Sequence, residues 1–187
     1  FEYIIQPPGT YGTTVPLALA QDSLKDEAHF VLMGGDDFVW HRDGTSELAL
    51  AIATWKHSGA DHVIMGNPVA RSEGVKYGIL SLDSKGILKN IDEKPPLERV
   101  PEQPLANISR YLFSDTIWPF INQEMNTKRG SDQPEHYITY PISAAAQSGQ
   151  RFQAHRVQGV YLDGGSFDGL QAAGNYITSQ LASIWHN

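Results

Sequence analysis

Acidic side chains directly follow two predicted strands of this sequence, and glycines adjoin both sites. Asp36 and Asp37 come after an apolar run and two glycines, and Asp163 follows a second apolar run and precedes two glycines. Ligands of open α/β sheets bind beyond the carboxyl ends of the strands. Two carboxylates facing one cleft there would suit Mg²⁺, which prefers oxygen ligands and is often shared with substrate phosphates. Each motif alone fits an ordinary turn equally well, because Asp and Gly are common turn residues.

A second set of candidates combines an acid, a cation and a glycine-rich loop. Glu93 and Lys94 lie side by side before two prolines. Lys94 could place a point charge on a phosphate, and Glu93 could accept hydrogen bonds from sugar hydroxyls. Composition alone favours a solvated loop end for this pair. Gln6, followed by Gly9 and Gly12, could frame a nucleobase beside a helix N-terminus.

Composition and spacing argue against several other chemistries. The sequence has 14 Lys and Arg against 21 Asp and Glu, a formal charge of −7, and no Cys. It therefore lacks the basic field that holds a nucleic-acid backbone, and it has no disulfide, thiolate metal site or Cys nucleophile. The histidines show no metal-ligand spacing, and no serine lies in G-x-S-x-G. No apolar run approaches the roughly 20 residues that cross a bilayer. We expect no nucleic-acid or membrane partner, and a cytoplasmic location.

The elements that would position these residues alternate between strands and helices in the first third of the chain, which predicts parallel βαβ units. The turn at 83–86 between two apolar runs predicts an antiparallel hairpin. Ser46 is placed to cap a helix that stops before Gly59. The predicted strands are 1–6, 29–33, 62–65, 77–82, 87–91, 108–113, 151–157 and 160–162. The predicted helices are 14–20, 47–57, 115–123, 135–147 and the residues after Ser166.

The last predicted helix has one apolar face, formed by Leu170, Ala173, Tyr176, Ile177, Leu181 and Ile184. We expect this face to pack on the sheet of its own chain; packing on a second copy, in a homo-oligomer, is the alternative. No repeat or low-complexity segment divides the sequence. We therefore expect a single domain over residues 1–187.

Further motifs join these candidates along most of the chain. They are Tyr77-Gly78, Glu93-Lys94-Pro95, Ser109-Arg110-Tyr111 with Ile117-Trp118, Glu135 with Thr139, and Leu162-Asp163-Gly164-Gly165. In this order they resemble the sugar-nucleotidyltransferase (NDP-sugar pyrophosphorylase) family, most of all its bacterial UTP–glucose-1-phosphate uridylyltransferases. The resemblance implies an α/β fold with a Rossmann-like mixed, mainly parallel sheet flanked by helices and an antiparallel hairpin insertion.

The resemblance also implies roles for single residues. Gln6 and Gly12 match the residues that contact the base, and Tyr77 and Gly78 match a pair whose glycine backbone meets the sugar. Glu93 and Glu135 match carboxylates on the hexose, and Lys94 matches the cation on the sugar phosphate. Asp36 and Asp163 match the two aspartates that bind Mg²⁺, so the implied catalytic set is Lys94, Asp36 and Asp163.

The implied reaction converts a nucleoside triphosphate and a hexose 1-phosphate to an NDP-hexose and pyrophosphate. UTP and glucose 1-phosphate are the expected substrates. In the family a glycine-rich loop with Gly-Thr-Arg and a Lys-Pro motif come before the segment that opens at Phe1. The resemblance therefore implies an N-terminally truncated chain without the main triphosphate cradle. Two alternatives remain open: a metal-dependent glycosyltransferase, and a non-catalytic nucleotide-sugar binding module.

Overall fold

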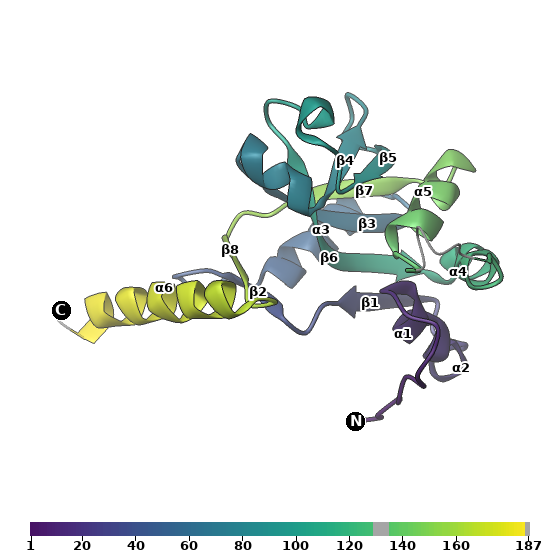
Figure 1. The fold of residues 1–187 in the computed structure, drawn as a ribbon, viewed down its shortest axis with the longest axis horizontal. Helices are drawn as coiled ribbons and strands as arrows, with labels where there is room; N and C mark the ends of the chain where they lie inside the picture. Colours follow the sequence, from purple (N-terminus) through teal and green to yellow (C-terminus); the bar gives the residue numbers. More distant parts are fainter. Residues whose placement is uncertain (129–134, 186–187) are drawn as a thin grey trace.

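A six-stranded mixed sheet forms the centre of the computed structural model, which describes residues 1–128 and 135–185 (Figure 1). The strands are β1 (His29–Met33), β2 (Asp37–Trp40), β3 (His62–Pro68), β4 (Gly78–Leu82), β5 (Leu88–Glu93), β6 (Leu105–Ser114), β7 (Phe152–Arg156) and β8 (Val160–Asp163). The order across the main sheet is β5-β4-β6-β3-β7, and β1 pairs with β6 beside this path. Strands β2 and β8 form a separate two-stranded sheet.

The mixed sheet confirms the predicted α/β fold class, but the sheet is not mainly parallel, because β3–β7 is the one parallel pair among its described strands. Strands β1, β3 and β4 each run antiparallel to β6, and β7 runs parallel to β3. These four strands therefore point the same way, although most neighbouring pairs are antiparallel. The predicted hairpin is β4–β5, and Gly86 in its turn has a φ of 78°. Glycine adopts this left-handed conformation without steric cost.

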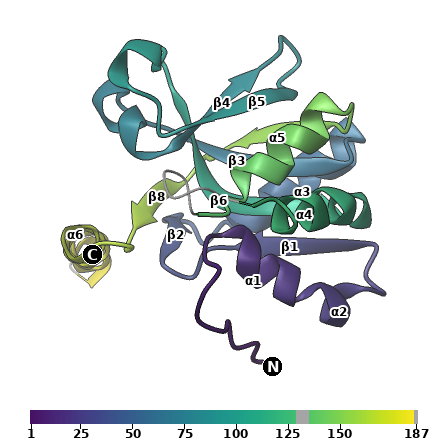
Figure 2. The same cartoon turned by 45° about the vertical axis from the view of Figure 1, so that its right-hand side comes forward.

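Helices pack on both faces of the main sheet, and a further helix lies beside the small sheet. They are α1 (Thr14–Leu19), α2 (Gln21–Leu24), α3 (Glu47–Ser58), α4 (Trp118–Met125), α5 (Thr139–Gln147) and α6 (Phe167–Trp185), with short 3₁₀ helices η1 (Arg71–Lys76), η2 (Leu97–Arg99) and η3 (Asp115–Ile117). Helices α4 and α5 lie on one face and α3 lies on the other (Figure 2). As predicted, Ser46 accepts a hydrogen bond from the Ala49 N–H, and Gly59 ends α3 in the left-handed conformation.

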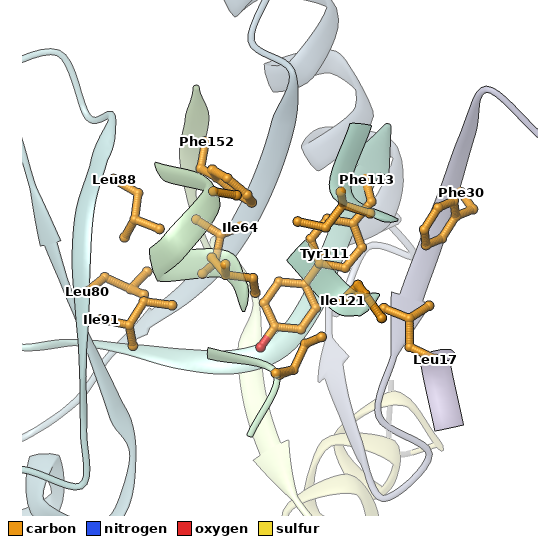
Figure 3. Close-up of a cluster of buried hydrophobic side chains, with 14 of the residues drawn as sticks. Leu17, Phe30, Ile64, Leu80, Leu88, Ile91, Tyr111, Phe113, Ile121 and Phe152 are labelled. Atoms are coloured by element: carbon orange, nitrogen blue, oxygen red, sulfur yellow. The ribbon is translucent and has the colours of Figure 1, made fainter. Parts of the chain in front are cut away.

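Alternating side chains of the central strands fill two cores. Ile64 packs on the α4–α5 side with an aromatic cluster that includes Tyr111, Phe113 and Phe152 (Figure 3). Val63, the preceding residue of β3, faces the α3 side. Both faces of the sheet are therefore buried, which explains the uninterrupted apolar run at 63–65 in β3.

Three predicted elements differ from the structure. Residues 1–6 form no strand, and Tyr3 and Ile5 are 89% and 87% exposed. A strand needs a neighbour for its backbone hydrogen bonds, and no described strand pairs with this segment. The apolar run of β1 predicts a strand covered on both faces, but only Phe30 in it is buried, and among the described strands β1 pairs with β6 alone. Helix α5 begins at Thr139, so Glu135 precedes it; the predicted loop residues 130–134 lie outside the described part.

The last helix does not pack on the main sheet, so that expectation was wrong. Helix α6 contacts β8 and extends away from the six-stranded sheet (Figures 1 and 2). Ala173 is buried, but Leu170 is 62% exposed and Leu181 is 41% exposed. The side chain of Ile184 lies outside the described residues. No helix in residues 1–128 and 135–185 combines the length and apolar character needed to cross a membrane.

Candidate functional site

The hairpin β4–β5 and the segment before α5 enclose a cavity of about 230 Å³, which we call the Glu93 pocket. Most of the site residues predicted from the sequence line this pocket. The lining consists of Thr13, Lys76, Tyr77, Gly78, Glu93, Lys94, Asn107, Ser109, Glu135, Tyr137, Ile138 and Thr139. Five residues that the motifs single out, Tyr77, Gly78, Glu93, Lys94 and Glu135, thus share one cavity although more than fifty positions separate the first from the last.

Glu93 lies at the end of β5, directly opposite Gly78 in the β4–β5 register. Its Oε2 accepts a hydrogen bond of 2.8 Å from the Thr139 hydroxyl. Burial raises the pKa of Glu93, and the bond from Thr139 opposes that rise. A Cβ at position 78 would lie 2.9 Å from this same Oε2. Glycine at 78 therefore leaves open the space in front of the carboxylate.

Lys94 is held by its backbone and by an aromatic ring. Its φ of 44° is unusual for a residue with a side chain, and its N–H donates to the Tyr77 carbonyl at 3.1 Å. Its Nζ lies 3.4 Å from the Tyr137 hydroxyl and 5.0 Å from the centre of that ring. Two effects raise the pKa of Tyr137: mainly its hydrogen bond with Glu135, and secondly burial. Tyr137 thus connects Lys94 to Glu135.

Strained backbone occurs at a second position of this pocket. Ser109 has a φ of 52°, and Lys94 and Ser109 are the two non-glycine residues with positive φ in the described chain. The Asn107 side chain accepts a 3.3 Å bond from the Ser109 N–H. Strain of this kind is concentrated at functional sites in proteins, where the surrounding structure maintains it.

A larger, open cavity of about 790 Å³ lies between the end of β8 and the start of α6, and we call it the Asp163 cleft. It is lined by Asp36, Lys76, Tyr77, Asp163, Gly165, Ser166, Asp168, Gly169 and Ala172. A Cβ at position 165 would lie 2.9 Å from Asp36 Oδ2 and 3.2 Å from Asp163 Oδ1. The two carboxylates therefore converge on one spot, and a side chain at 165 would fill it.

Asp37 differs from its neighbour Asp36. Its Oδ1 accepts bonds of 3.0 and 2.6 Å from the Arg110 guanidinium, and its Oδ2 accepts a 3.0 Å bond from Tyr161. Burial raises the pKa of Asp37 although Arg110 opposes that rise. Asp37 is thus engaged inside the protein, whereas Asp36 lines the cleft.

Lys76 and Tyr77 line both cavities and so connect them. The Tyr77 hydroxyl lies 3.4 Å from Asp163 Oδ2. Burial, and secondly the negative charge of Asp163, raise the pKa of Tyr77. Lys76 forms a 2.6 Å ion pair with Glu73. Sequence reasoning missed Lys76 and Tyr137. The only sequence signal for Lys76 is that it directly precedes Tyr77-Gly78, and the only signal for Tyr137 is that it lies two positions after Glu135.

The loop with Gln6 and Gly12 lies beside the Glu93 pocket but lines neither cavity. Gln6 is exposed and its amide donates to the Thr10 carbonyl at 3.2 Å. Gly12, with a φ of 127°, packs so closely that a side chain would collide with the His136 backbone. The loop is fixed there by two backbone bonds, of 2.9 Å from Thr14 to His136 and 3.0 Å from His136 to Tyr11.

Comparison with known proteins gives one family and several similar structures. The family model described as nucleotidyl transferase matches residues 1–180. An apo UDP-glucose pyrophosphorylase structure has a TM-score of 0.79 at 25% identity over 96% of this chain and 64% of that chain. A UDP-glucose pyrophosphorylase complexed with UDP-glucose has a TM-score of 0.78 at 24% identity over 94% and 65%. A UTP-bound enzyme of this name from Acinetobacter baumannii has a TM-score of 0.73 at 25% identity over 92% and 58%.

The chain is shorter than these similar proteins. It spans 64% of the first, 65% of the second and 58% of the third. A search of curated proteins finds no match.

Proposed function

The chain belongs to the nucleotidyl transferase family, and from this we propose that the protein to which it belongs transfers a nucleotidyl group from UTP to glucose 1-phosphate. The products are UDP-glucose and pyrophosphate. The observation that carries the proposal is the pairing of two cavities, one with Glu93, Lys94 and Glu135 and one with two converging aspartates. UDP-glucose and UTP also occupy the similar structures described above.

The Glu93 pocket binds the sugar in this proposal. Glu93 and Glu135 accept hydrogen bonds from hexose hydroxyls, and the open backbone at Gly78 lets the ring come close. Tyr77 closes the pocket on the side of the cleft. The volume of about 230 Å³ suits a single hexose better than a whole nucleotide sugar, because drug-sized ligands occupy roughly 300–1,000 Å³.

Lys94 neutralises the sugar phosphate and orients it for reaction. An oxygen of that phosphate attacks the α-phosphorus of UTP, a new O–P bond forms, and the bond to the β-phosphate oxygen breaks. Pyrophosphate leaves with that electron pair, so atoms and charge balance. The residues contribute by positioning and electrostatics, since the reaction needs no covalent enzyme intermediate.

Asp36 and Asp163 would hold Mg²⁺, and the convergence of their oxygens beside Gly165 supports this assignment. In the described part of the chain no cluster of three or more His, Cys, Asp or Glu could hold a metal. Two carboxylates open to a cleft fit Mg²⁺, which usually keeps waters and shares substrate phosphates. When bound, the ion would neutralise charge on the reacting phosphates.

The uracil binds at the loop with Gln6 and Gly12 in this proposal. Gln6 and Gly12 are assigned to the uracil on the motif resemblance, and the backbone bonds of this loop to His136 support its location beside the sugar pocket. A substitution of Gln6 tests this role, because it should weaken UTP binding and leave glucose 1-phosphate binding unchanged.

The reverse reaction gives the cleanest test of the activity. The protein to which this chain belongs should convert UDP-glucose and pyrophosphate to UTP and glucose 1-phosphate, detected by chromatography of the nucleotides. Release of UDP with transfer of glucose to an acceptor would instead indicate a glycosyltransferase. Calorimetric binding of UDP-glucose without any turnover would indicate a binding module.

A further inference from the structure

Glu47, the first residue of α3, is a buried carboxylate that lines neither of the two cavities. It is 6% exposed. The Nε2 atoms of His41 and His155 lie 2.6 and 2.7 Å from its two oxygens. The backbone N–H groups of Gln158 and Gly159 also donate to it, with shortest distances of 3.1 and 2.9 Å.

These partners come from separate parts of the fold. His155 belongs to β7 of the main sheet, and its Nδ1 lies 2.8 Å from the Thr54 hydroxyl of α3. His41 directly follows β2, and Gly159 directly precedes β8. One carboxylate therefore joins the main sheet and α3 to both strands of the small sheet.

The attachment lies at the opposite end of the small sheet from the cleft. In the β2–β8 register Trp40 pairs with Val160 next to Glu47, and Asp37 pairs with Asp163 at the cleft. The approach at the Glu47 end is close, since a Cβ at position 159 would meet His41 Nε2 and Val39 Cγ1 at 2.6 Å each. Gly159 is thus required for this contact.

The charge of Glu47 gives the attachment its strength. Burial by itself raises the pKa of Glu47, but the bonds from Gly159, His155, His41 and Gln158 more than offset it, and the pKa is lowered. A buried carboxylate is stable only when it is hydrogen-bonded and compensated in this way. Hydrogen bonds to ionised groups are roughly twice as strong as neutral ones.

We propose that Glu47 is a positioning residue that fixes the small sheet, and with it the separation of Asp36 and Asp163, through its bonds to His41 and to the 158–159 turn. At the cleft end the Arg110–Asp37 pair holds the same sheet, at 2.6 Å. Glu47 touches no substrate and acts only through the strands that carry the aspartates. Its relevance to metal binding rests on the proposed function, whereas its effect on the small sheet does not.

The test is amide hydrogen exchange of the full chain, with Glu47→Gln compared to wild type. Gln keeps the size but loses the charge and half of the acceptor capacity. Exchange in β2 and β8 should rise about tenfold, while β3 and β6 stay unchanged. The matched control is Glu124→Gln, which removes another buried Glu–His pair, at 2.8 Å, and should leave β2 and β8 unchanged.

A second readout is the affinity for Mn²⁺ alone, which Glu47→Gln should lower several-fold and Glu47→Asp should partly restore. If Glu47→Gln fails to fold, His41→Ala, which removes a single bond, serves in its place and should loosen β2. If amide exchange in β2 and β8 of the Glu47→Gln chain is as slow as in wild type, the inference is overturned. No Mn²⁺ binding by wild type, with localised loosening still present, would instead overturn only the metal assignment.

Discussion

Gly165 offers the sharpest perturbation of the proposed metal site. In Gly165→Ala the new methyl carbon would lie 2.9 Å from Asp36 Oδ2 and 3.2 Å from Asp163 Oδ1. An ordinary carbon–oxygen contact begins at about 3.3 Å, so the Asp36 carboxylate must retreat by roughly 0.4 Å. Protein–metal distances tolerate only about 0.2 Å of error, and Mg²⁺ demands near-ideal geometry.

The expected loss is about tenfold in metal affinity, or about 1.4 kcal/mol, the low end of what a change in the residues that orient metal ligands costs. Titration with Mn²⁺, followed by its paramagnetic effect on water relaxation, measures it directly. Position 165 is exposed and lacks a positive φ, so thermal stability should not change.

Gly35→Ala is the matched control for this measurement. Gly35 also adjoins Asp36, but a Cβ there meets nothing within 4 Å. Its Mn²⁺ affinity should equal that of wild type. If Gly165→Ala also binds Mn²⁺ like wild type, the two aspartates do not hold the ion at this spot, and the reasoning fails.

Three further predictions follow from the contacts of the site. Thr139→Val removes the bond that opposes burial at Glu93, so the Glu93 pKa rises further. The ionised form of Glu93 accepts hydrogen bonds from sugar hydroxyls. As the pH is lowered, the variant should therefore lose glucose 1-phosphate binding at a higher pH than wild type does. If both proteins lose binding at the same pH, Glu93 does not bind the sugar in this way. Arg110→Met leaves Asp37 buried without its guanidinium, and urea unfolding should show a loss of about 3–5 kcal/mol, whereas an unchanged midpoint would contradict the pairing. Lys76→Met should weaken calorimetric binding of glucose 1-phosphate about three- to tenfold, and Lys76→Arg should restore most of it; equal affinities would remove Lys76 from the site.

Local signals in the sequence predicted a large part of the fold. The cap at Ser46, the stop at Gly59 and the turn before Gly86 depend on a few neighbouring residues, and all three occur in the structure. Strand β3 was recognisable because burial on both faces leaves an apolar run at 63–65. Strand β6 is buried as well, but Asn107, Ser109 and Arg110 interrupt its apolar residues.

Elements that depend on distant partners were not predictable in this way. Strand β2 has four residues and exists through its pairing with β8, more than 120 positions later. Residues 1–6 carry a strand-like sequence, but β propensity without a neighbour does not make a strand. Helix α6 has the apolar face expected of a packed helix, and sequence periodicity does not state what that face contacts.

The site shows the same division. Motif order was sufficient to bring Tyr77, Glu93 and Glu135 together in one expected site, and they line one cavity. The different situations of Asp36 and Asp37 depend on Arg110, which approaches from β6 and pairs with Asp37. The roles of Lys76 and Tyr137 depend on three-dimensional proximity alone, so no local pattern could identify them.

The central claim is that the Glu93 pocket and the Asp163 cleft act as one site for nucleotidyl transfer. The most direct measurement is Mg²⁺-dependent pyrophosphorolysis of UDP-glucose by the protein to which this chain belongs, with wild type compared to Asp163→Asn. We expect UTP and glucose 1-phosphate from wild type, and a turnover at least about tenfold lower for Asp163→Asn. Equal turnover of the two proteins, or no UTP from either, would contradict it.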